Sequence, residues 1–207
     1  MNQPNRLKNI PVTLPYKSIY VRLGHHQTKS NIPETQKSKI DQYINEAFEL
    51  CDNQAVWNDF RFTLLNGDTI SIEDYKIQSK KLWKFIENSE KILLIASTVG
   101  EEIVQKRDHY MKTGNMTKAV IYDAVAAETA DSILDWIRNY LIQKFLRSGY
   151  SLTKFRISPG YHDLSLSVQK WIFQQLLLEE IGLNLTDSMI IIPEKSVTAF
   201  YGLIKLN

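Results

Sequence analysis

The chain has 207 residues, of which 43% are hydrophobic, and this is the size of one domain with a single core. Its 25 Lys and Arg against 23 Asp and Glu leave a formal net charge of +2, which lacks the basic excess of nucleic-acid-binding proteins. The lone cysteine, Cys51, excludes an internal disulfide framework, and no apolar run approaches the roughly 18 residues of a membrane span. The first residues lack the apolar core of a signal peptide. We therefore expect one compact domain of a soluble, cytoplasmic protein.

The N-terminal quarter predicts an arm, a strand and a helix. Residues 1–17 are polar and carry three prolines, which favours an extended arm on the surface or against a partner. Residues 18–23, closed by Gly24, have the composition of a short strand. The apolar residues of 34–51 recur at helical spacing, so this segment is expected to form an amphipathic helix.

The rest of the chain alternates hairpins and helices. The predicted elements are a hairpin of 60–65 and 68–72, a helix over 80–87, a strand over 91–97, a helix over 101–113, a long helix over 118–148, a strand over 153–158, a helix from Ser165 or Ser167 to Ile181, and a second hairpin of 189–193 and 197–204. Asn66-Gly67 tolerates the positive φ angles of a tight turn, and Ser79 can cap the following helix. Hairpins among separated helices do not make a doubly wound sheet. The prediction is an α+β fold with a mostly antiparallel sheet.

The long helix combines apolar and acidic residues on one face. At 100° per residue the apolar members of that face are Val120, Ala124, Ala127, Leu134, Leu141 and Phe145. Asp131 falls among them, while Glu128 and Asp135 lie at the edge. A carboxylate on a buried face needs a partner, because an unpaired buried charge is costly. Either basic residues of neighbouring elements pair with this acidic strip, or it holds a cationic ligand or backbone amides.

A second unusual segment is Arg156-Ile-Ser-Pro-Gly-Tyr161. Arg156 can bind a carboxylate with two parallel hydrogen bonds, Gly160 lets a ligand approach the backbone, and Tyr161 can stack on a flat ring. A plain strand–turn–helix connection is the alternative. With the acidic strip, the segment suits a zwitterionic amino acid joined to an aromatic base, a description that S-adenosylmethionine meets. Signatures of nucleotide loops, nucleophile elbows and zinc helices are absent, and the histidines are too scattered for a metal site.

These residues resemble the activation domain of vitamin B12-dependent methionine synthase, and more closely the stand-alone proteins that look like that domain. The resemblance is carried by 156–161, 181–188 and 193–198, and it extends over residues 18 to 204. It implies that residues 18–207 form a C-shaped single domain with a twisted, mostly antiparallel sheet and flanking helices.

The resemblance also implies a ligand and its contacts. The ligand is S-adenosylmethionine, whose carboxylate is bound by Arg156. The backbone of Ser158 and Gly160 contacts the ligand, Tyr161 packs beside it, and Glu128 is the acidic contact. Asp131 is the second candidate for the acidic contact. Two further contacts of the family, an aspartate near the start of its domain and a tyrosine beyond the last hairpin, have no counterpart in the matched residues.

In the synthase this domain supports the reductive methylation that rescues an inactive, oxidised cobalamin. The chain has no Asp-x-His-x-x-Gly motif, so the resemblance implies that cobalamin comes from a partner, either a cobalamin-binding methionine synthase or a related corrinoid protein. It also implies a flavodoxin-like electron donor, and a chain that is not catalytic alone. The alternative is a protein that docks on or handles a corrinoid protein and has lost S-adenosylmethionine binding, which the two unmatched contacts favour.

Overall fold

The computed structural model of the chain describes residues 3–25 and 32–206. Its helices are α1 (Tyr16–Arg22), α2 (Glu34–Phe48), α3 (Lys80–Ile86), α4 (Glu102–Lys112), α5 (Met116–Leu146) and α6 (Val168–Leu176), followed by the 3-10 helix η1 (Leu178–Ile181). Its strands are β1 (Asn5–Leu7), β2 (Gln54–Arg61), β3 (Thr63–Leu65), β4 (Thr69–Ile72), β5 (Tyr75–Gln78), β6 (Lys91–Thr98), β7 (Tyr150–Leu152), β8 (Asn184–Leu185), β9 (Ile191–Ile192) and β10 (Ser196–Lys205). None of the described helices is both long and apolar enough to span a bilayer.

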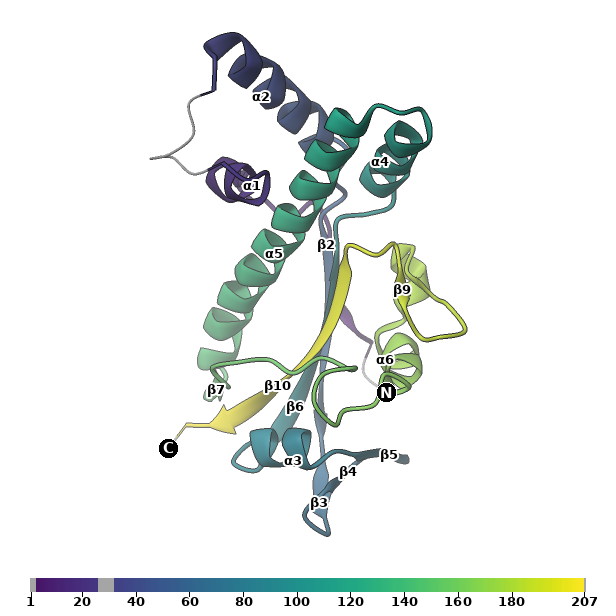
Figure 1. The fold of residues 1–207 in the computed structure, drawn as a ribbon. Coiled ribbons are helices and arrows are strands. Elements are labelled where there is room, and N and C mark those ends of the chain that lie inside the picture. The colour runs from purple at the N-terminus through teal and green to yellow at the C-terminus, as the bar shows by residue number, and fades with distance from the viewer. Residues whose placement is uncertain (1–2, 26–31, 207) are drawn as a thin grey trace.

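The main sheet has five strands in the order β1-β2-β6-β10-β7, and every neighbouring pair is antiparallel. The sheet curls into a half-barrel that helices flank on both sides (Figure 1). The hairpin strands β3, β4 and β5 form a separate small sheet, and β8 pairs with β9. The predicted α+β single domain with a mostly antiparallel sheet is therefore confirmed.

Strand β6 explains how one sheet holds two cores. Its alternate residues point to opposite faces, so Leu93 and Ile95 pack with α2, α4 and α5 while Ile92 and Leu94 pack with α3 and α6. All four side chains are fully buried. The continuous apolar run of this strand is thus the pattern of a strand that is covered on both faces.

Several local predictions from the sequence are confirmed. Asn66 and Gly67 adopt φ angles of 51° and 75° in the turn between β3 and β4, as a primed hairpin turn requires. Ser79 caps α3 by accepting a hydrogen bond from the Leu82 amide. Helix α5 is the longest element, and Gly149 follows its end with a φ of 79°.

The predicted strand at residues 18–23 is wrong, because this segment lies in helix α1. Ile19 is fully buried in the core that α5 also lines, so tertiary packing outweighs the β-propensity of the short run. The preceding arm is not detached from the domain. Its residues 5–7 pair with β2 as an edge strand, and Ile10 is buried in the same core.

The predicted second hairpin is also wrong. Strand β9 pairs with β8, whereas β10 is inserted between β6 and β7 in the main sheet. The ten residues of β10 find eight partners along β6, many more than the two-residue β9 can offer. The helix predicted to reach Ile181 breaks at Leu177, which adopts a left-handed conformation with a φ of 50° between α6 and η1.

Candidate functional site: a cleft between helix α5 and the sheet

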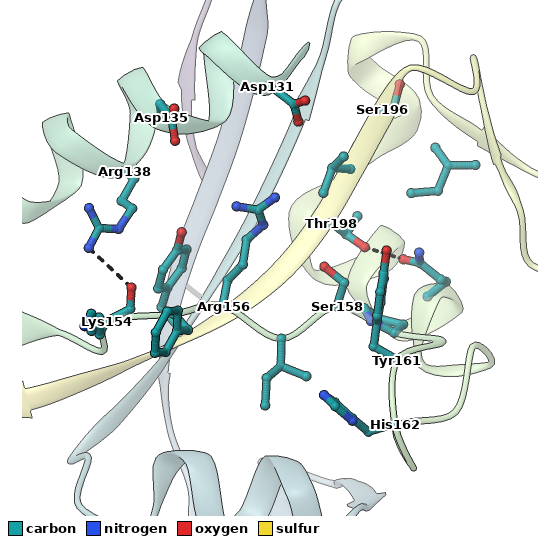
Figure 2. A pocket seen from close by; sticks show the side chains of 17 residues that line it. Asp131, Asp135, Arg138, Lys154, Arg156, Ser158, Tyr161, His162, Ser196 and Thr198 are labelled. Atoms are coloured by element: carbon teal, nitrogen blue, oxygen red, sulfur yellow. Dashed lines mark hydrogen bonds between the residues drawn. The ribbon is translucent and has the colours of Figure 1, made fainter. Parts of the chain in front are cut away.

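A cleft of about 800 Å³ lies between α5, strand β10 and the segment that connects β7 to α6 (Figure 2). Three charged residues of α5 line it, namely Asp131, Asp135 and Arg138. The connecting segment contributes residues 154–159, 161 and 162, and β10 contributes Ser196, Val197, Thr198 and Tyr201. Four of the six residues predicted to bind a ligand therefore share one cleft: Asp131, Arg156, Ser158 and Tyr161.

A bulge brings Arg156 into the cleft and corrects the strand predicted over 153–158. The Thr153 amide donates to the Gly202 carbonyl at 3.0 Å, and Ile157 exchanges two hydrogen bonds with Phe200 at 3.1 and 2.7 Å. Three residues, 154–156, therefore oppose Tyr201 alone. Because the extra residues cannot join the ladder, they bend away from the sheet, and all three are exposed.

The guanidinium of Arg156 is available to a ligand. In Figure 2 it extends from the bulge toward Asp131 on α5. Within the described part of the chain, no carboxylate lies within 4.0 Å of it. Arg156 also acts on the buried Tyr201, whose pKa is raised by burial although the charge and the hydrogen bond of Arg156 oppose that shift. A guanidinium at the edge of a cleft is suited to a ligand carboxylate.

Asp131 provides the opposite charge, but the structure does not place it on the buried face of α5. That face is formed by residues such as Val125, Thr129, Ile133 and Ile137, whereas Asp131 is exposed toward the cleft and Val120 is 53% exposed. The predicted face is confirmed for Ala124, Leu134, Leu141 and Phe145, which are buried, and wrong for Val120 and Asp131.

The electrostatic surroundings of Asp131 favour its neutral form. Partial desolvation raises its pKa first, and repulsion by Glu128 adds to the effect, while Arg22 and Arg156 oppose it. A cationic ligand group in the cleft would favour the ionised carboxylate instead.

Glu128, the first candidate for the acidic contact, is engaged elsewhere. Its Oε1 accepts a hydrogen bond from Arg22 Nε at 2.5 Å, its side chain is only 15% exposed, and it does not line the cleft. Arg22 ends helix α1, which the sequence did not predict. The sequence left open whether basic residues of neighbouring elements pair with the acidic strip. The structure shows such a pair for Glu128, and among the described residues it shows none for Asp131.

The turn after the bulge has the backbone geometry that its glycine requires. Gly160 has a φ of 86° and its amide donates to the Leu164 carbonyl at 2.8 Å, while the Tyr161 amide donates to the Ser158 carbonyl at 3.2 Å. Tyr161 is 67% exposed and lines the cleft. Gly160 shapes this turn without lining the cleft itself.

The sequence did not predict the buried polar residues Gln169, Ser196 and Thr198, which also line the cleft. Thr198 Oγ1 donates to Gln169 Oε1 at 2.6 Å, and Ser196 Oγ donates to Thr98 Oγ1 at 2.8 Å. All of these side chains are buried. Isolated threonines, serines and glutamines carry no periodic signal, so only the pairing of β10 with β6 and its packing against α6 could reveal them.

The cleft fits the ligand that the sequence suggests. Its volume lies within the range of about 300–1,000 Å³ that is common for small-molecule sites. It offers a cation for a carboxylate, a carboxylate for an ammonium or sulfonium group, and exposed aromatic rings at Phe155 and Tyr161 for a flat base. Over residues 3–25 and 32–206, no group of His, Cys, Asp and Glu side chains could hold a metal ion.

Comparisons with known proteins identify the fold. No protein-family model matches the chain, and no curated protein matches it either. Among solved structures, it matches the crystal structure of the MetH reactivation domain bound to AdoHcy, with a TM-score of 0.67 and 15% sequence identity. The match covers 96% of this chain and 78% of that one. The chain is thus similar in fold to the MetH reactivation domain, the kind of domain that its sequence motifs resemble.

Proposed function

We propose that this chain binds S-adenosylmethionine in the cleft and serves as the reactivation module of a cobalamin-dependent methionine synthase. The observation that carries the proposal is the juxtaposition of Arg156, which has no carboxylate partner among the described residues, with Asp131 across a cleft of about 800 Å³. The solved structure of similar fold, which is bound to AdoHcy, supports it.

Different residues of the cleft contact different parts of the proposed ligand. Arg156 binds the carboxylate with two parallel hydrogen bonds, and Asp131 attracts the ammonium and sulfonium charges. The backbone of Ser158 contacts polar atoms of the ligand, Gly160 shapes the turn that presents them, and Tyr161 packs beside the adenine ring. The ligand, when bound, supplies a methyl group. The protein contributes its orientation and the electrostatic surroundings, since the corrinoid of a partner does the covalent chemistry.

Titration calorimetry with S-adenosylmethionine tests the ligand. We expect saturable binding by the wild type, and a loss of affinity of about tenfold to a hundredfold in Arg156→Ala, because a charge-assisted pair is removed. Arg61→Ala is the matched control: Arg61 is an exposed arginine whose side chain lies outside the cleft, and its loss should leave the affinity unchanged. A wild type that does not bind the ligand refutes the proposal.

Reactivation in trans tests the partner. The protein is added to a cobalamin-bearing methionine synthase that lacks its own reactivation module, together with S-adenosylmethionine and a flavodoxin-like reductant. We expect turnover to resume after the cobalamin has been oxidised, and Arg156→Ala to abolish the effect. The Arg61→Ala control should reactivate normally.

One observation favours the second candidate, a protein that docks on a corrinoid protein without binding the methyl donor. Arg22 already pairs with Glu128, the carboxylate that the sequence resemblance aligns with the family's acidic contact. Capture of a corrinoid-loaded protein, with no thermal shift on addition of S-adenosylmethionine, would support this candidate over the first.

A further inference from the structure

One carboxylate, that of Asp163, ties the turn of the cleft to helix α3, an element that contributes no residue to the cleft lining. Asp163 Oδ1 accepts a hydrogen bond from Ser79 Oγ at 2.6 Å, and both of its oxygens lie 3.3 Å from the Lys81 amide. Ser79 is 2% exposed and itself accepts from the Leu82 amide. The carboxylate therefore extends the N-cap of α3 through a buried serine.

The turn that Asp163 holds has an unfavourable backbone. Gly160 and His162 both have positive φ angles, 86° and 56°, on either side of Tyr161. Glycine adopts this region freely, but His162 carries a Cβ and does so only at an energetic cost. Such a conformation persists when the surrounding contacts over-determine it. Asp163 is the next residue along the chain.

Packing alone does not account for the conformation of this turn. Tyr161, His162 and Asp163 are exposed, and the buried apolar residues are Ile157 and Pro159 at the start of the turn and Leu164 after it. Apolar contacts are not directional, so they fix where the turn begins and ends without fixing the rotation of its middle residues. The hydrogen bonds of a carboxylate are directional and charge-assisted.

We infer that Asp163 is a positioning residue for the ligand site. By capping α3, it holds residues 158–162 in the conformation that presents Ser158 and Tyr161 to the cleft. Asp163 does not line the cleft and acts through the turn. The identity of the ligand in this inference rests on the proposed function, whereas the effect of Asp163 on the conformation of the turn is independent of it.

The test compares S-adenosylmethionine affinity among matched variants. We expect Asp163→Ala to weaken binding about fivefold or more, since it removes a hydrogen-bonded anchor. Asp163→Asn should restore part of the affinity, because its amide oxygen can still accept from Ser79. Adding Ser79→Ala to Asp163→Ala should weaken binding little further, because both changes break one contact. Asp74→Ala, which removes an exposed carboxylate outside the cleft, is the control.

Hydrogen exchange separates this inference from the proposed function. In Asp163→Ala the amides of Gly160, Tyr161 and Leu164 should exchange faster than in the wild type, while those of β6 keep their protection. The inference is overturned if the amides of the turn exchange at the same rate in Asp163→Ala as in the wild type. It is also overturned if the wild type binds S-adenosylmethionine and Asp163→Ala binds it equally well. If the wild type binds no S-adenosylmethionine, the proposed function fails, and the exchange rates alone decide whether Asp163 positions the turn.

Discussion

Arg156 is available to a ligand because a bulge after β7 puts three residues opposite one residue of β10. Residues 154–156, which follow β7, stand opposite Tyr201 of β10 alone, so the arginine leaves the ladder and reaches into the cleft. A regular strand would have alternated its side chains between the two faces of the sheet. The side chain of Arg156 extends toward the carboxylate of Asp131 on α5, 25 positions earlier in the sequence.

Replacing Asp131 with Asn tests whether that carboxylate serves a ligand at the expense of stability. The raised pKa means that the native state disfavours the ionised form, so the contribution of Asp131 to stability falls as the pH rises from 3.8, its ordinary pKa, through the raised value. We expect Asp131→Asn to melt at a higher temperature than the wild type at neutral pH. The difference should shrink in acid, and binding of S-adenosylmethionine should weaken.

Melting curves across the pH range and calorimetry at neutral pH measure both effects. Asp74→Asn, an exposed carboxylate outside the cleft, is the control. An Asp131→Asn variant that melts at a lower temperature than the wild type and binds S-adenosylmethionine equally well would contradict the role of Asp131 as a ligand contact.

At the scale of elements, an ion cluster joins α4, α5 and the loop before β10. Its members are Arg107, Asp108, Asp123, Glu194 and Lys195. Asp123 lies 3.0 Å from Arg107 and 2.9 Å from Lys195. The loop of this cluster continues directly into Ser196 and Val197, which line the cleft.

Asp123→Asn should destabilise the protein in a pH-dependent way. Partial burial alone would raise the pKa of Asp123, but hydrogen bonds from Lys195 and Arg107 outweigh it and hold the pKa below the ordinary 3.8. The stabilisation is therefore present above pH 3.8 and is lost as the pH falls through the lowered value. We expect the variant to melt below the wild type at neutral pH and to approach it in strong acid. A constant difference at all pH values would point to packing instead of charge.

At the scale of the whole molecule, one sheet separates two apolar cores. Leu94 and Ile95 are adjacent and fully buried, but they belong to opposite cores. We expect Leu94→Ala and Ile95→Ala each to lower the free energy of unfolding by about 2–5 kcal/mol, the usual cost of such a cavity. Since both cores share β6, denaturant unfolding followed by circular dichroism should remain a single transition in both variants. Two separate transitions would show that the cores unfold independently.

The sequence predicted the elements whose signals are local. The Asn66-Gly67 turn, the Ser79 cap and the long helix α5 all follow from residues a few positions apart, and all three are confirmed. The strand at 18–23 failed because its burial against α5 outweighs a short run of β-prone residues. The second hairpin failed because adjacency in sequence does not decide which strand offers the longer ladder.

The same division holds for the candidate site. Arg156, Ser158 and Tyr161 were predicted together because they lie in one short motif, and the structure brings them into one cleft. Asp131 was predicted from a helical pattern that placed it on the buried face, whereas it is exposed toward the cleft. The buried polar residues of the cleft, such as Gln169 and Thr198, come from separate elements and share no motif. Asp163 follows the motif directly, yet its role depends on a contact with Ser79, 84 positions away.

By itself, the sequence determined that this chain is one α+β domain with a mostly antiparallel sheet, and which short segments carry an arginine, a glycine turn and a carboxylate. Hydrophobic periodicity, capping and turn chemistry act over a few residues, so they can be read directly. Only the tertiary structure decided that Arg22 engages Glu128 and leaves Asp131 to the cleft, and that a bulge turns Arg156 toward it. These outcomes depend on pairing between distant segments, whose energies local patterns do not contain.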